Sequence, residues 1–366
     1  MFLPPRCPNT SCPMHKEPVA GFFRKQGYYK AKCRPRPIPR FQCKVCARGF
    51  SRQTFRMDYR DHKPDLNPRL FELLASGVGL RQSSRMLRLS LRCTELKFRK
   101  VARHLRGLNR NLCSNLPPNA SLQLDELETY EARRTSRPVT VPIVIEEDSR
   151  FIIATRPAPI RASGPMTRTR LRAIQQDEAR FGKRQTRSRS AVYAVLKRTA
   201  RVAERMPEVR LRSDEKTTYP SIANRVFGAE RVTHQTTSSR LARGTWNPLF
   251  PINHTEAMAR DLTGRLRRDS WLASKHRWFL SRQLEVFAAF RNLVRTRFNR
   301  DRATPAQMLG FTSRPLRVTE LLTWRQDWRA NSLHPLARSA IRRRRRVPVS
   351  PVNRRHRAST PNPVSP

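Results

Sequence analysis

Acidic residues are scarce in this chain. Asp and Glu together number 27 against 76 Lys and Arg in 366 residues, which gives a formal net charge of +49. A surface so poor in carboxylates attracts polyanions, of which nucleic acid is the most common, and argues against a self-contained metabolic enzyme. Only 12 of the basic residues are lysine. A GC-rich coding bias toward arginine is therefore an alternative source of part of this charge.

Long apolar runs are also lacking. No stretch approaches the roughly 18 consecutive apolar residues of a membrane-spanning helix, so we expect no contact with a membrane. The first six residues lack the apolar region of a signal peptide, and we expect a cytoplasmic protein. Apolar residues still make up 37% of the sequence and recur periodically, which is enough for a folded core. The length suits two or three domains.

Cysteines are few but grouped. Cys7 and Cys12 form one pair, and Cys43 and Cys46 form a second pair thirty residues further on. Two such knuckles separated by short strands can hold Zn²⁺ tetrahedrally, and four free buried thiols are the alternative. Gly49 follows the second pair and is expected to supply a positive φ for a tight turn. The remaining cysteines lack a partner at this spacing and are expected to be bystanders: Cys33, Cys93 and Cys113.

Helical periodicity follows at 66–107. Gly77 and Gly79 interrupt it, a second helix is expected at 80–87, and a third begins at about residue 94. Short helices with a tight turn and a basic last helix are typical of a helix-turn-helix, whose last helix lies in the major groove of DNA. An ordinary bundle with a solvated basic face is the alternative. The candidate DNA contacts of the last helix are Lys97, Arg99, Lys100 and Arg103.

From about residue 119 the spacing of the apolar residues changes from the helical period to a period of two, as in a strand. Alternation at 121–127 and apolar runs at 139–145 and 151–155 predict an antiparallel meander of three strands. A helix at 188–205 and a fourth strand at 209–214 come next. The polar, Arg-rich residues 157–186 between them are expected to form a loop.

Three carboxylates fall at informative places in this order of elements. Asp125 lies in the first strand, Asp214 ends the fourth, and Glu256 lies early in a later helix. Three antiparallel strands, a helix and a fourth strand are the element order of an RNase H-like core, which brings such carboxylates together. Phosphodiester chemistry uses a trio of this kind to hold two divalent cations, and Mg²⁺ prefers oxygen ligands.

With these motifs, the sequence resembles a bacterial insertion-sequence transposase with a DDE catalytic core. The resemblance spans most of residues 1–330, and it rests on the order and combination of short motifs. These are the two cysteine knuckles with the segment Cys46–Phe55, then Leu124–Leu127, Arg212–Glu215, Ile252–Glu256 and Thr304–Gly310.

The resemblance implies that Asp125, Asp214 and Glu256 bind Mg²⁺ or Mn²⁺ and are the catalytic residues. Arg260, one helical turn after Glu256, is a candidate contact to a DNA phosphate, and a solvated arginine is the equal alternative. Many DDE enzymes carry a basic residue seven positions after the glutamate, where this chain has Thr263. For Asp125 the alternative is an exposed strand acid beside Glu126 and Glu128. Glu215 is a competing choice for the second position, and Glu230 and Asp261 are competing choices for the third.

The expected organisation has four parts: a zinc ribbon at 1–60, a helix-turn-helix at 61–112, the RNase H-like core at 113–330 and a disordered Arg/Pro-rich tail at 331–366. The expected function is a DNA transposase that cleaves insertion-sequence ends and transfers them to target DNA, as a nucleoid-associated homodimer or larger assembly. The alternative is a catalytically inactive, transposase-derived DNA-binding protein.

Overall fold

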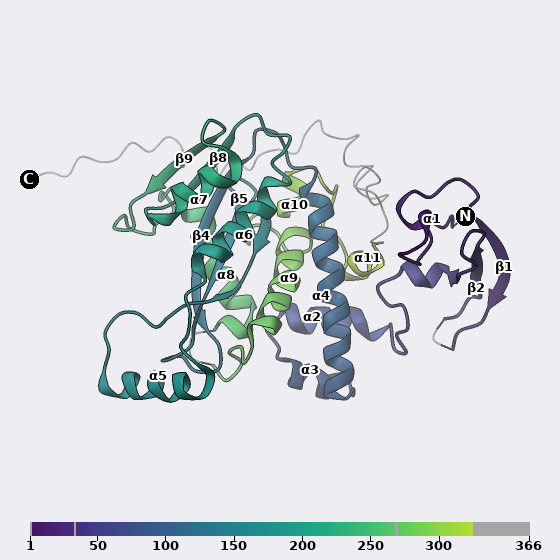
Figure 1. The fold of residues 1–366 in the computed structure, drawn as a ribbon, viewed down its shortest axis with the longest axis horizontal. Coiled ribbons are helices and arrows are strands. Elements are labelled where there is room, and N and C mark those ends of the chain that lie inside the picture. The colour runs from purple at the N-terminus through teal and green to yellow at the C-terminus, as the bar shows by residue number, and fades with distance from the viewer. Residues whose placement is uncertain (1, 33, 268–269, 325–366) are drawn as a thin grey trace, which may run out of the picture.

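A computed structural model describes residues 2–32, 34–267 and 270–324. Figure 1 shows a small N-terminal body beside a larger body of mixed helices and strands. Each body has its own buried apolar cluster, since the N-terminal cluster around Phe22 and Phe41 is separate from those of the larger body. The chain is therefore an α/β protein preceded by a small unit with a core of its own.

The N-terminal body is a three-stranded antiparallel sheet with a short helix. Its elements are α1 (Pro13–Lys16), β1 (Phe23–Tyr29), β2 (Ile38–Cys43), β3 (Gly49–Ser51) and the 3₁₀ turn η1 (Arg52–Phe55). Phe41 and Phe50 stack with ring centroids 5.8 Å apart in the same buried cluster as the cysteines. So small a unit buries few side chains, and it therefore depends on its cysteines as well as its rings.

Three helices follow, as the sequence predicted: α2 (Leu66–Ala75), α3 (Leu80–Met86) and α4 (Leu91–Cys113). The Ser90 hydroxyl caps α4 by accepting a hydrogen bond from the backbone N–H of Cys93 at 3.2 Å. The buried side of α4, including Phe98 and Leu105, belongs to the same apolar cluster as the strands that follow. These helices are therefore packed onto the larger body and do not stand apart from it.

The larger body contains one six-stranded sheet. Its strands are β4 (Ser121–Tyr130), β5 (Pro138–Glu146), β6 (Ile152–Thr155), β7 (Ala158–Pro159), β8 (Val209–Asp214) and β9 (Val232–Thr237). The order is β6-β5-β4-β8-β9, with β7 paired to β5. Strands β4, β5 and β6 are antiparallel neighbours, whereas β8 is parallel to β4 and β9 is parallel to β8. The expected meander and fourth strand are present, and β9 is an addition.

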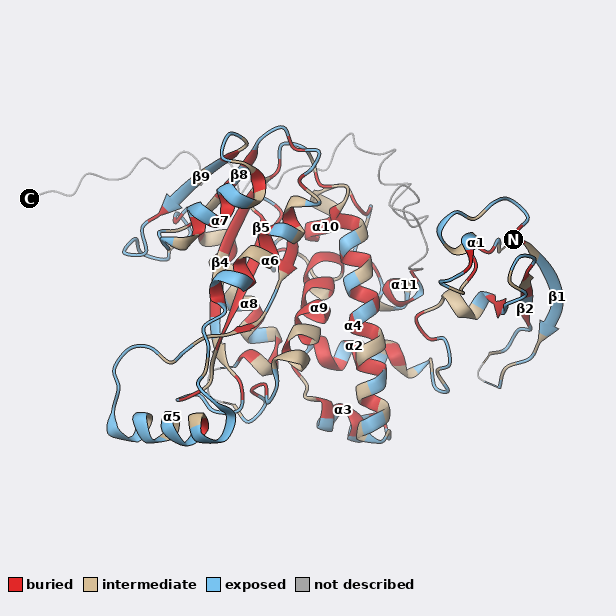
Figure 2. Cartoon of the chain, in the orientation of Figure 1, coloured by how far each residue is buried: buried red, intermediate tan, exposed pale blue. Residues whose placement is uncertain are grey.

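Helices cover both faces of this sheet, and the centre is buried (Figure 2). One face, with Leu122 and Leu124, packs on α6 (Ser188–Ala200) and α7 (Thr218–Phe227). The other face, with Leu127, packs on α8 (Phe250–Leu262) and α9 (Arg277–Leu293), and α9 also contacts α4. The remaining short elements are η2 (Gly264–Leu266), α10 (Pro305–Met308) and α11 (Val318–Thr323).

The segment 157–186 is not the loop expected from its composition. It contains α5 (Arg168–Phe181), which Thr167 caps by accepting from the N–H of Arg170 at 3.3 Å. Asp177 is the buried residue of this helix, which lies at the margin of the body (Figure 1). A helix that buries so little has few apolar residues, so its composition resembles that of a loop.

Two expectations fall outside the described residues: the role of Cys33 and the disordered tail at 331–366. Of the helices that the structure describes, none combines the length and apolar character needed to cross a bilayer.

Candidate functional site

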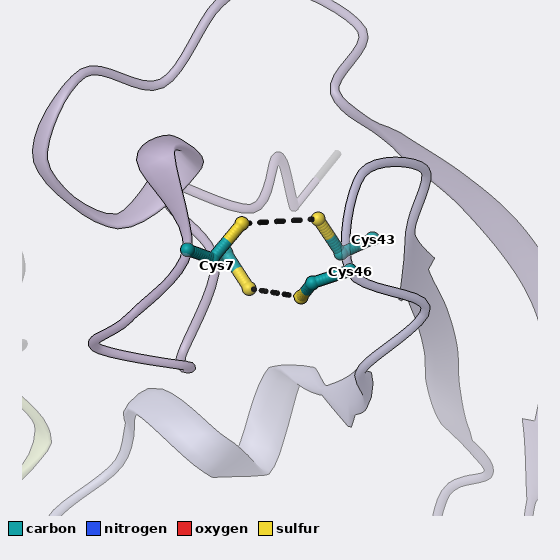
Figure 3. Close-up of side chains that lie close together, drawn as sticks. Cys7, Cys43 and Cys46 are labelled. Atoms are coloured by element: carbon teal, nitrogen blue, oxygen red, sulfur yellow. Dashed lines mark hydrogen bonds between the residues drawn. The ribbon is translucent and has the colours of Figure 1, made fainter.

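The four knuckle cysteines converge in the N-terminal body. Their sulfur atoms all lie within 4.8 Å of one another, with Cys7 to Cys46 at 3.5 Å and Cys12 to Cys43 at 3.9 Å. Figure 3 shows the side chains of Cys7, Cys43 and Cys46 directed toward a common centre. Sulfurs bonded tetrahedrally to Zn²⁺ at about 2.3 Å lie roughly 3.8 Å apart, so the spacing fits a closed structural zinc site.

The environment of these thiols also suits a cation. Burial raises the pKa of Cys7 to about 12, whereas the backbone N–H of Arg48 lowers the pKa of Cys46 to about 6. Four thiolates cannot gather without a compensating positive charge, which Zn²⁺ would supply. The turn after Cys46 takes its positive φ at Ala47 (57°), and Gly49 lies outside that region of φ, so the role expected of Gly49 is wrong.

A second group of candidate residues lies on the sheet face that carries α8. Leu124 of β4 aligns with Ser213 of β8, so the next residues along these parallel strands, Asp125 and Asp214, are neighbours on the opposite face. Asp125 accepts a hydrogen bond from the N–H of Glu126 at 2.6 Å, and Asp214 accepts one from the N–H of Lys216 at 3.3 Å. Both residues are partly buried. They come directly after Leu124 and Ser213, the last residues at which β4 and β8 pair with each other.

Helix α8 brings Glu256 to the same face. Gln123, fully buried two residues before Asp125, accepts a hydrogen bond from the N–H of Ile252 at 3.1 Å and donates one to the carbonyl of Pro248 at 2.8 Å. These two bonds fasten the start of α8 to β4. The Oε1 atom of Glu256 is buried and has no hydrogen-bond partner among the described residues, so this carboxylate has unused capacity as a ligand.

The three carboxylates influence one another electrostatically. Burial raises the pKa of Asp125 to about 6, and the charge of Asp214 adds to the effect. Burial also raises the pKa of Glu256 well above its usual value, with a further contribution from Asp125. Arg243 opposes both shifts from the loop that precedes α8. Within the described residues, the group close enough to hold a metal ion as it stands is that of the four cysteines, and these carboxylates are not part of it.

The neighbouring acids occupy other environments. The buried carboxylate of Glu126 faces the opposite side of the sheet, where it forms an ion pair with Lys216 and accepts from Ser188 at 2.7 Å and Tyr219 at 3.2 Å. Glu126 is therefore part of a closed structural network. The other alternative acids are exposed: Glu128, Glu215, Glu230 and Asp261.

The candidate DNA contacts on α4 divide into buried and exposed groups. Lys97 is 3% exposed, and its ammonium donates to Asp61, to Asn67 at 3.1 Å and to the carbonyl of Lys63 at 2.6 Å. Lys97 is a buried structural cation, and the expectation that it contacts DNA does not fit this position. The ammonium of Lys97 balances the charge of the Asp61 carboxylate, which is buried beside it.

The other candidates remain nearer the surface. Arg99 lies over the ring of Trp278 at 4.5 Å, and Lys100 donates to the carbonyl of Tyr59 at 2.7 Å. Arg103 is exposed. Arg260 donates to the carbonyl of Glu128 in β4 at 2.7 Å, so it braces α8 against the sheet.

The sequence matches no protein-family model and no curated protein. Two residues of the site were not singled out from the sequence: Gln123 and Arg243. Gln123 gave one signal, since a polar residue inside an alternating strand must find partners once it is buried. Arg243 gave none, because it is one arginine among many and acts from a loop.

Proposed function

We propose that this protein is a DDE-type DNA transposase with an RNase H-like core. The observation that carries the proposal is the common face shared by Asp125, Asp214 and Glu256, which come from two adjacent parallel strands and a helix. Burial and the neighbouring carboxylates raise the pKa values of Asp125 and Glu256. The strand order β6-β5-β4-β8-β9, with three antiparallel strands followed by two parallel ones, supports the same assignment.

The three carboxylates fit a hard divalent cation by their donor chemistry. Asp125, Asp214 and the unpartnered Oε1 of Glu256 would hold Mg²⁺ or Mn²⁺, which supplies activation of the attacking oxygen and stabilisation of the leaving oxygen. Gln123 keeps α8 in register with β4, and Arg243 is placed to offset negative charge at the site. Without a cation the three carboxylates repel one another, and a bound cation would relieve this repulsion.

The proposed partners are insertion-sequence ends and target DNA. The charge of +49 favours phosphate contacts, and the cysteine centre with the basic side of α4 provides candidate binding surfaces. Joining two ends calls for at least a homodimer on DNA. Association with the nucleoid follows from this proposal.

A cleavage assay on DNA carrying the element ends tests the proposal. Asp125→Asn, Asp214→Asn and Glu256→Gln should each abolish divalent-dependent cleavage while DNA affinity stays within about twofold. Glu215→Gln is the matched control, since Glu215 adjoins Asp214 but is exposed, and it should cleave normally. Normal cleavage by all three variants would overturn the DDE assignment. No cleavage by the parent, together with tight DNA binding, would favour the inactive DNA-binding alternative.

A measurement of stability tests the cation site without relying on activity. Added Mg²⁺ should raise the thermal midpoint of the parent, because it binds the folded carboxylates and not the unfolded chain. Asp125→Asn should lose this increase, and Glu215→Gln should keep it. An equal increase in all three proteins would mean that Mg²⁺ binds elsewhere.

A further inference from the structure

A cavity of about 790 Å³ lies on the side of α8 that faces away from the carboxylates. Its walls come from the turn between β5 and β6, from Arg212 of β8, from the loop before α8 together with one side of α8, and from residues 291–301, which span the end of α9 and the segment after it. Glu256 does not line it, whereas Phe250 and His254, from another side of the same helix, do. On α8 the cavity therefore lies on a different side from Glu256, while Arg212 of β8, two residues before Asp214, also lines it.

Arg150 is the unusual residue of this cavity. It is only 7% exposed, and its Nε and Nη1 atoms are buried with no hydrogen-bond partner among the described residues. The guanidinium lies 3.9 Å from the ring centroid of Phe298 and 5.1 Å from that of Phe250. An arginine is almost never buried without an acceptor, because unmet charged donors cost several kcal/mol in a folded protein.

The backbone at Arg150 is strained as well. Its φ is +61°, a left-handed conformation that a long side chain rarely adopts. The turn is held in place by the buried Glu146, whose carboxylate accepts from the N–H of Asp148 at 3.2 Å and the N–H of Ser149 at 2.8 Å. A rigid turn thus forces an unpartnered cation into the cavity, which is the kind of arrangement found at binding sites.

The surroundings carry charge of both signs. Besides Arg150, five arginines line the cavity, and so do four acids: Glu147, Asp148, Asp261 and Asp301. Arg291 and Arg297 are both buried on the cavity wall, and Arg297 pairs with Asp301 at 2.6 Å. Burial lowers the pKa of Arg150 to about 9, and the charges of Arg297 and Arg291 act in the same direction. Unlike Arg297, Arg291 donates its hydrogen bonds to backbone carbonyls, those of Thr296 and Arg297, which do not neutralise its charge. Asp301 pairs with Arg297 and Glu147 pairs with Arg212, whereas Arg150 and Arg291 have no carboxylate partner among the described residues. A bound anion would balance these two buried cations.

We infer that this cavity binds the phosphate group of a nucleotide, with Arg150 as its central donor. A planar guanidinium suits phosphate oxygens, and the volume is of the size that holds a small ligand. Trp246 supplies a platform for the base: it lines the cavity, is 58% exposed, and lies against Gly244, where a Cβ would come within 2.6 Å of its Nε1. The assignment of the ligand as a nucleotide rests on the proposed function on DNA, whereas the assignment of a phosphate site rests on the surroundings of Arg150.

Calorimetric titration of the full chain tests the phosphate site. The probes are inorganic phosphate and thymidine 5′-monophosphate at constant ionic strength, so that the source of the phosphate is distinguished. Arg150→Gly removes the guanidinium and relieves the left-handed strain, and it should weaken both probes at least tenfold. Arg60→Gly is the matched control, because Arg60 is also an arginine at positive φ (57°) but is exposed outside the cavity. It should bind both probes within twofold of the parent.

A second variant tests the nucleotide assignment. Trp246→Ala should weaken thymidine 5′-monophosphate about tenfold, as expected for loss of one stacked base, and leave inorganic phosphate unchanged. Parent-like phosphate binding by Arg150→Gly, or by Arg150→Asn if the first variant fails to fold, would overturn the phosphate site. Equal weakening of both probes by Trp246→Ala would overturn the nucleotide. Because Asp125→Asn should bind both probes normally, failure of cleavage and failure of this site are separable.

Discussion

The side-chain amide of Gln123 bonds to the backbone N–H of Ile252 at 3.1 Å and thereby joins the central strand β4 to helix α8. The same side chain reaches the carbonyl of Pro248 at 2.8 Å, so both of its polar atoms are satisfied by one segment. Asp125 and Glu256 lie on the two elements that this bridge connects. The distance between two proposed ligands therefore depends on a residue that is itself no ligand.

Gln123→Leu tests whether this bridge affects the cleavage rate as well as the stability of the fold. The change keeps the size but leaves a buried N–H and a buried carbonyl unmet, which costs about 2–4 kcal/mol of the free energy of unfolding. The cleavage rate should fall by more than the fraction of unfolded protein accounts for, because α8 is no longer fastened to β4. Urea unfolding and the cleavage rate check this together. Gln175→Leu, at an exposed position of α5, is the control and should change neither.

Asp125→Asn should make the protein more stable at neutral pH. The folded-state pKa of Asp125 is raised to about 6, so the folded protein binds a proton more tightly than the unfolded chain, and stability falls as pH rises from about 4 to 6. The amide removes this penalty, which we expect to be about 2–3 kcal/mol at pH 7 without added divalent cations. Urea unfolding at pH 4 and pH 7 measures it. The pH dependence should be smaller in the variant, and an equal dependence would contradict the prediction.

Glu126→Gln should destabilise the protein, although Glu126 adjoins a proposed catalytic residue. The carboxylate is buried and bonded to Lys216, Ser188 and Tyr219, and an amide cannot accept from all of them. We expect a loss of about 1–3 kcal/mol in the free energy of unfolding. The folded fraction should still cleave. Glu215→Gln provides the exposed comparison and should lie within about 0.5 kcal/mol of the parent.

The strands and the cysteine centre could be predicted because their signals are local. Alternation at 121–127 marks β4, and the short spacing within each cysteine pair marks the two halves of the centre. Strand β9 was missed because it lies at the sheet edge, where the sequence Val-Thr-His-Gln-Thr-Thr has little apolar content. Burial of a charge was missed for another reason. Lys97, which meets Asp61, lies one helical turn before the buried Val101 on the apolar face of α4, but its basic side chain predicts exposure like that of Arg103.

Cys43→Ser should release zinc from the N-terminal body. One thiolate of four is removed, and a closed structural site needs all four, so the metal content should fall from about one Zn²⁺ per chain toward zero. The ribbon should unfold while the larger body keeps its thermal transition, since the two have separate apolar clusters. Metal analysis and calorimetry measure both effects. Cys93→Ser, in α4 and outside the cluster, should retain the metal; a parent without zinc, purified without chelator, would contradict this prediction.

Deletion of residues 332–366 should weaken binding to all DNA sequences to a similar degree. This segment carries the run Arg342–Arg346 and no acidic residue, so it should bind phosphates. The slope of log affinity against log salt should fall by about 0.9 for each phosphate that the tail no longer neutralises. Binding titrations at several salt concentrations measure the slope. Selective loss of one preferred sequence would instead make the tail a specificity element.

The separate core of the N-terminal body has a consequence for how this chain can change over time. The body meets the rest of the molecule near Asp58, which receives Arg34 from the ribbon and Arg56 from the connection. Neither apolar cluster needs the other to remain packed. A different N-terminal body could be exchanged at this joint without disturbing β4, β8 or α8, so what this body binds could diversify while the proposed carboxylate site stays the same.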